Sequence, residues 1–94
     1  MAFSYSDKNF TVIGNLCFVH ILLDGTKTSY DIPPAIVDRM LFNDFIAIYP
    51  YFNNNERGIN SPDISFAVIS SGKITCIKAA KSYLFLYFPI DSNK

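Results

Sequence analysis

The clearest indication of structure lies between residues 10 and 23, which read Phe10-Thr-Val-Ile-Gly-Asn-Leu-Cys-Phe-Val-His-Ile-Leu-Leu23. β-Branched and aromatic residues dominate this stretch, as they do in strands. Gly14-Asn15 divides it, and Gly followed by Asn tolerates the positive φ that a two-residue hairpin turn requires. The stretch therefore predicts two antiparallel strands, Phe10–Ile13 and Leu16–Leu23, joined by a tight turn.

Turn-forming residues divide the rest of the chain at short spacing. Asp24-Gly25 supplies a second turn, and Ser71-Gly72 marks a hairpin turn in the C-terminal third. Proline cannot donate to a strand ladder, so Pro33-Pro34 and Pro50 are expected to end the strands before them. The predicted strands are Phe10–Ile13, Leu16–Leu23, Thr28–Asp31, Asp44–Tyr49, Ile64–Ser70, Lys73–Lys78 and Tyr83–Ile90. Short strands with turns this frequent predict an antiparallel β-sandwich or barrel.

Two stretches are not predicted as strands. Ala35–Phe42 follows Pro34 and has apolar residues at helical spacing, which favours one or two helical turns, although an irregular crossover loop fits nearly as well. Residues 53–62 contain many turn formers and no periodicity, which predicts a long exposed loop. We expect one mostly β domain over residues 1–94, with at most one short helix near Ala35–Phe42 and with ends, 1–8 and 91–94, that fray.

Two predicted strands, Leu16–Leu23 and Tyr83–Ile90, are apolar on both faces. Antiparallel strands that face water alternate apolar with polar residues, so each of these strands is expected to be covered on both sides. Half of the residues are apolar, more than a lone domain of 94 residues can hide, so a second copy is the favoured cover. The residues expected at the interface between copies are Val19, Ile21, Leu23, Leu84, Leu86 and Phe88.

Charge and hydropathy argue against several kinds of partner. Eight basic and eight acidic residues cancel, whereas nucleic-acid binders neutralise phosphates with a surplus of Lys and Arg. The first residues lack the basic and apolar regions of a secretory signal, and no apolar run approaches the roughly 20 residues of a membrane helix. We therefore expect a chain made and folded in the cytoplasm, with no nucleic-acid partner and no membrane insertion.

No familiar catalytic or metal-binding set is visible in the sequence. His20 is the only histidine, and on a strand its side chain points to the opposite face from Cys17, which argues against a nucleophile–base pair. Zinc sites take about four clustered ligands, whereas Cys17, His20 and Cys76 offer three from separate positions. The two cysteines fit reduced, buried thiols, and a disulfide between them stays open. We expect no enzyme activity, no metal and no cofactor.

The polar loop and the strand before it carry the candidate ligand contacts. Aromatic rings offer flat apolar platforms while Asn and Arg offer directed hydrogen bonds, a combination suited to sugars. The alternative is an ordinary solvated loop whose aromatic residues point inward, because loops collect Asn in any case. The candidate ligand-binding residues are Tyr49, Tyr51, Asn53, Asn54, Asn55 and Arg57.

The order of these features resembles the head domains of phage tail-fibre and baseplate proteins. Phe10-Thr-Val-Ile-Gly-Asn-Leu-Cys-Phe-Val19 is similar to their opening, and Asp31-Ile-Pro-Pro34 to the crossover that follows it. Ile69-Ser-Ser-Gly-Lys-Ile-Thr75 resembles their late hairpin, and Lys81-Ser-Tyr-Leu-Phe-Leu-Tyr-Phe88 their final strand. The resemblance implies a trimeric jelly-roll head, similar in outline to tumour-necrosis-factor-like heads, that belongs to the virion and binds cell-surface saccharide.

These observations together predict a non-catalytic binding domain that works as a homo-oligomer, with three copies favoured. Two alternatives stay open. One is a small phage- or bacteria-encoded inhibitor or accessory protein that binds an intracellular protein target. The other is a structural virion component whose apolar faces contact other virion proteins. All three place the function on a surface.

Overall fold

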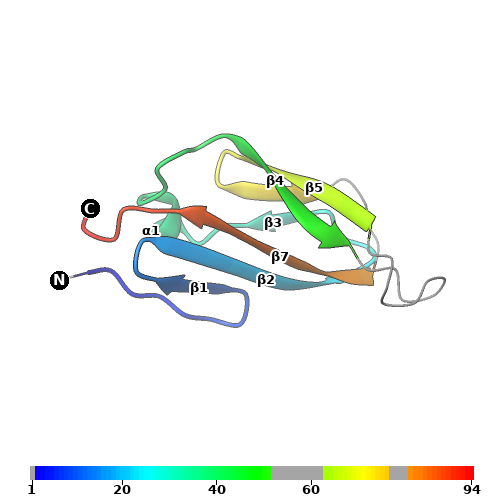
Figure 1. The fold of residues 1–94 in the computed structure, drawn as a ribbon, viewed down its shortest axis with the longest axis horizontal. Coiled ribbons are helices and arrows are strands. Elements are labelled where there is room, and N and C mark those ends of the chain that lie inside the picture. Colours follow the sequence, from blue (N-terminus) through cyan, green and yellow to red (C-terminus); the bar gives the residue numbers. More distant parts are fainter. Residues whose placement is uncertain (1, 52–62, 77–80) are drawn as a thin grey trace.

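The structure is a computed structural model that describes residues 2–51, 63–76 and 81–94 (Figure 1). Within these ranges the chain forms seven strands and one short helix. The elements are β1 (Phe10–Ile13), β2 (Leu16–Asp24), β3 (Ser29–Asp31), α1 (Pro34–Val37), β4 (Phe45–Tyr51), β5 (Asp63–Ser70), β6 (Lys73–Cys76) and β7 (Lys81–Pro89). The sequence placed all seven strands, with boundaries that agree to within a few residues.

The strands form two antiparallel sheets that pack face to face, and Figure 1 shows the two layers. Sheet A has the order β1-β2-β7, and sheet B has the order β3-β6-β5-β4. Pairing is nested, because β4 pairs with β5, β3 with β6 and β2 with β7. In sheet B, β3 lies beside β6 at the end of the meander β4-β5-β6, which is a Greek key, the connection from which jelly rolls are built. The predicted antiparallel β-sandwich with one short helix is confirmed.

The two predicted hairpin turns form as the sequence indicates. Gly14 has φ of 60° between β1 and β2, so a residue without a Cβ is favoured at that position. Between β5 and β6 both central residues have positive φ, 54° at Ser71 and 74° at Gly72, which is the pattern of a type I′ turn. These turns fix the register of two hairpins and therefore determine which side chains share a face.

The core lies between the sheets and takes alternate residues from each strand. β2 contributes Cys17, Val19, Ile21 and Leu23, and β7 contributes Leu84, Leu86 and Phe88. Sheet B covers them with apolar residues of β4, β5 and β6. Residues outside these strands also enter the core, namely Phe10 and Val12 of β1, Ile32, Ile36 of α1, Met40 and Ile90. The core residues of sheet B are Ala47, Tyr49, Ala67, Ile69, Ile74 and Cys76.

Three details differ from the sequence prediction. β4 continues through Pro50 to Tyr51, because β4 is an edge strand of sheet B and its outer side needs no ladder donor. The helix is a single turn that ends at Val37, and Met40 then forms an isolated bridge with Ile90. The ends expected to fray are hydrogen-bonded, since the Phe3 amide donates to the Ser92 carbonyl at 2.8 Å.

Candidate functional site

The six residues predicted at the interface between copies lie in the core of the single chain. Val19, Ile21, Leu23, Leu84, Leu86 and Phe88 are between 0 and 6% exposed. Sheet B covers this face completely, so these side chains are not accessible to a second copy. Both strands are apolar on both faces, as predicted, but the face expected between copies forms the core of the single chain.

The uncovered face of sheet A is apolar and rich in rings, and we call it the aromatic face. Large side chains of β2 and β7 project from it, with Leu22 at 64% exposed and Tyr87 at 64%. The rings contact one another along and across the strands, with centroids 5.9 Å apart for Phe18–Tyr87 and 5.7 Å for Tyr83–Phe85. The aromatic face consists of Leu16, Phe18, His20, Leu22, Tyr83, Phe85 and Tyr87.

The opposite side of the sandwich carries a second uncovered surface, which we call the aliphatic face. It covers the β4–β5 half of sheet B, where Ile48 pairs with Phe66 and Ile46 with Val68. The aliphatic face consists of Ile46, Ile48, Ile64, Phe66 and Val68, which are 37 to 77% exposed. Polar residues replace this pattern on the neighbouring strands, where the exposed Lys73 of β6 meets Asp31 of β3. The apolar surface is therefore confined to part of sheet B.

A groove joins the two faces where the edge strands β4 and β7 lie beside each other (Figure 1). Its volume is about 450 Å³. Phe45 and Phe88 close its floor, with ring centroids 5.8 Å apart. Its lining carries no charged side chain and consists of Phe45, Ile46, Ala47, Ile48, Pro50, Phe85, Leu86, Tyr87, Phe88 and Pro89. Apolar surface thus continues from one sheet to the other around this edge.

The predicted ligand-binding residues are not brought together in the described part of the chain. Tyr49 is 1% exposed and packs in the core beside Cys76, so it does not reach a ligand at the surface. Tyr49 and Ala47 are two residues apart on β4, so their side chains point to the same face, which is the inner one. Tyr51 is the last residue of β4. Asn53, Asn54, Asn55 and Arg57 lie outside the described residues.

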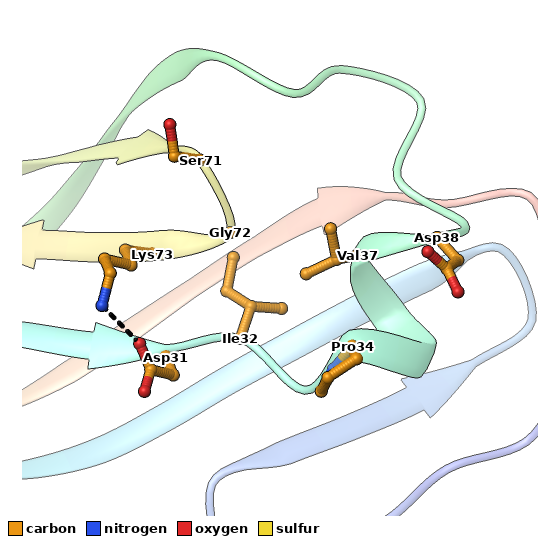
Figure 2. A pocket seen from close by; sticks show the side chains of 8 residues that line it. All are labelled: Asp31, Ile32, Pro34, Val37, Asp38, Ser71, Gly72 and Lys73. Atoms are coloured by element: carbon orange, nitrogen blue, oxygen red, sulfur yellow. Dashed lines mark hydrogen bonds and ion pairs between the residues drawn. The ribbon is translucent and has the colours of Figure 1, made fainter.

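A hollow of about 400 Å³ lies beside α1 and is lined by both apolar and charged side chains (Figure 2). In Figure 2 Lys73 points toward Asp31, and its Nζ lies 2.8 Å from Asp31 Oδ1. The hydrogen bond and charge of Lys73 hold the pKa of Asp31 below its ordinary value. Both side chains are more than half exposed and neutralise each other. The hollow therefore offers no unpaired charge at this point to an incoming ligand.

The remaining chemistry-bearing residues act within the fold. Cys17 and Cys76 are free and buried, and burial raises the pKa of the Cys17 thiol to about 12. A thiol that stays protonated is a poor nucleophile. His20 lies on the aromatic face, its Nε2 3.4 Å from Thr11 Oγ1, while Cys17 points into the core, so the two share no site. Among the residues that the structure describes, no three His, Cys, Asp or Glu side chains are grouped as metal ligands would be.

Sequence reasoning missed the exposed set Leu22, Tyr83, Phe85 and Tyr87, although one feature could have identified it. Tyr and His place an apolar body against the protein and a polar tip toward water. His20, Tyr83 and Tyr87 share one face of sheet A, whereas the buried residues described on the other face are aliphatic apart from Cys17, Phe10 and Phe88. The face with polar tips is the face that the single chain leaves uncovered.

No protein-family model matches the chain, and neither a curated protein nor a solved structure matches it. In the described ranges, no helix has the length and hydropathy needed to cross a membrane.

Proposed function

We propose that this chain is a non-catalytic binding domain that works as a homo-oligomer joined through its uncovered apolar surfaces. The observation that carries the proposal is the aromatic face, on which Leu22, Tyr83, Phe85 and Tyr87 are 49 to 64% exposed. Monomeric proteins rarely expose a contiguous apolar patch of more than a few hundred Å². A second surface of the same kind lies on β4 and β5, so contacts between subunits are needed to cover both.

The electrostatics of the chain support association between copies. Net charge keeps proteins apart in solution, and this chain has a formal net charge of zero. The aromatic face carries no Asp, Glu, Lys or Arg. Two copies therefore meet without repulsion between like charges, and without the cost of burying an unpaired one.

The finer form of the proposal follows from the resemblance to phage tail-fibre and baseplate heads. In that form three copies make a receptor-binding head that attaches to cell-surface saccharide through its loops. The Greek-key sandwich is compatible with such a head. The apolar surfaces require only that more than one copy be present, so the number of copies and the saccharide are tested separately.

The alternative is a protein partner in place of further copies. A small inhibitor or a structural virion component would use the same apolar faces against another chain. The size of the exposed surface favours this alternative and self-association equally. The formal net charge of zero favours copies of one chain, because an inhibitor gains association rate and specificity from a charge opposite to that of its target.

The test is the mass of the purified chain by light scattering at micromolar concentration, for the wild type and for Leu22→Lys. We expect an oligomer that Leu22→Lys dissociates at least in part, since the substitution places a charge on the aromatic face. The control is Thr75→Lys on the polar half of sheet B, which is expected to keep the wild-type mass. A strictly monomeric wild type would contradict the proposal.

The saccharide is tested on a glycan array with the oligomeric protein. Retention of a discrete set of glycans, lost when free glycan competes, would support host attachment. If the oligomer binds no glycan but co-purifies in fixed ratio with one defined protein, the protein-partner alternative replaces it.

A further inference from the structure

We propose that two copies of this chain pair through the outer edge of β7, antiparallel and centred on Phe85, so that two three-stranded sheets become one six-stranded sheet. The inference rests on the proposed self-association and names the contact that makes it.

Three of the four edges in the described sandwich are blocked by devices that prevent strand pairing. The edge of β1 is covered by the preceding segment, where the Val12 amide donates to the Tyr5 carbonyl. β3 is only three residues long, and β4 contains Pro50. Short strands, proline and covering segments are the usual protection of edges.

Along its centre the edge of β7 carries no such device and forms no ladder with β4, which lies across the groove from it. Residues 82–88 contain no charged residue and no proline, and Lys81 and Pro89 mark the two ends of the strand. Near Pro89 the edge is occupied, because the Leu41 amide lies 3.4 Å from the Pro89 carbonyl oxygen. An uncharged, extended edge of this length is a ready template for another strand.

The backbone of β7 presents the correct groups to that edge. The His20 amide donates away from β7, to the Asn9 carbonyl, so its partner Phe85 belongs to a pair without hydrogen bonds across β2 and β7. The amide and carbonyl of Phe85 therefore point to the outer edge. Since direction alternates along a strand, the same holds for Tyr83 and Tyr87.

The sequence of the edge is symmetric about its middle residue. Residues 83–87 read Tyr-Leu-Phe-Leu-Tyr, so antiparallel pairing centred on Phe85 places Phe85 opposite Phe85 of the second copy. It also places Tyr83 opposite Tyr87 of the second copy, and the outward backbone groups then form about six hydrogen bonds. Because the contact is its own complement, it closes at two copies and does not propagate.

Pairing at this edge also joins the aromatic faces of the two copies. Side chains stand roughly perpendicular to a sheet, so Tyr83, Phe85 and Tyr87, which are 51, 49 and 64% exposed, lie beside the rings of the second copy on one face of the six-stranded sheet.

The decisive experiment is a charge exchange at the twofold axis. Directly opposite residues in a strand pair have Cβ atoms about 4.5–5.5 Å apart, so like charges there repel and opposite charges attract. We expect Phe85→Lys alone and Phe85→Asp alone to have half the wild-type mass by light scattering. An equimolar mixture of the two is expected to recover the wild-type mass. Thr75→Lys, on the polar half of sheet B, serves as the matched control and is expected to leave the mass unchanged.

Disulfide trapping determines the register between the two β7 strands, and its result does not depend on a change in folding stability. Phe85→Cys is expected to cross-link to itself under mild oxidation, whereas Tyr83→Cys cross-links only in a mixture with Tyr87→Cys. The native Cys17 and Cys76 are buried and do not compete.

The outcomes separate this contact from the broader proposal. An oligomer of three copies, or one whose dissociation by Phe85→Lys is not reversed by Phe85→Asp, overturns the β7 contact and leaves self-association intact. A filament in place of a dimer also overturns it, because an isologous contact closes. A wild type that is monomeric at every concentration overturns both.

Discussion

The two faces of β7 are nearly equal in hydrophobicity and opposite in burial. Leu84, Leu86 and Phe88 are 0 to 6% exposed, whereas Tyr83, Phe85 and Tyr87 are 49 to 64% exposed. The inner residues are packed by sheet B, and the outer residues have only their neighbours on the same face. Hydrophobicity in this chain therefore marks two kinds of surface, one that holds the fold and one that the single chain leaves exposed.

The largest difference in stability between the two faces is expected when a phenylalanine on each face is replaced by alanine. Phe88→Ala, in the core, is expected to lower the free energy of unfolding by about 3–5 kcal/mol, because it leaves a cavity that sheet B cannot fill. Phe85→Ala, on the outer face, is expected to cost less than about 1 kcal/mol within one chain. Urea unfolding at a concentration too low for association measures both. Equal losses would show that the outer face is packed within the single chain.

A smaller difference is expected when side chains are enlarged. Ala67 is fully buried on the inner face of β5, and Val68 beside it is 37% exposed on the outer face. Ala67→Leu is expected to cost about 1–3 kcal/mol through overpacking of the core. Val68→Leu is expected to change stability by no more than about 0.5 kcal/mol. A tolerated Ala67→Leu, seen as an unchanged urea midpoint, would mean that the space between the sheets is not filled.

The smallest effect is expected where the outer face becomes polar, at Asp31 and Lys73. The pKa of Asp31 is lowered in the folded protein, so its contribution to stability is present above the ordinary carboxyl pKa of 3.8 and is lost as the pH falls below it. Both side chains are well exposed, so the contribution is minor. The difference in urea midpoint between wild type and Lys73→Met should shrink when the pH is lowered through this range. A difference that stays constant would remove the ion pair as its cause.

The strand positions were predictable because short local sequences determine the turns between the strands. Gly14-Asn15 and Ser71-Gly72 are short-range patterns whose backbone requirement does not depend on the rest of the fold. The extension of β4 through Pro50 was not predictable, because it depends on β4 being an edge strand. Whether a strand lies at the edge or in the centre is decided by the arrangement of the whole sheet.

The assignment of faces failed for a physical reason that no local pattern removes. Val19 and Phe18 are both suitable for a core, and only the position of sheet B decides that Val19 enters it. For the same reason Tyr49 was expected at the surface and lies in the core. Where the residues on both faces of a strand are apolar, the sequence pattern predicts the strand but not which face is buried.

The nested pairing has a consequence for how the molecule is made. Closing a loop costs more entropy as the loop lengthens, so we expect the local hairpins to form most readily and the β2–β7 ladder, which joins residues 16 and 89, to form last. The outer edge of β7 is therefore expected to be complete only when the chain has finished folding. We expect an incompletely folded chain to have no competent edge to offer, which couples recruitment of a second molecule to completion of the first.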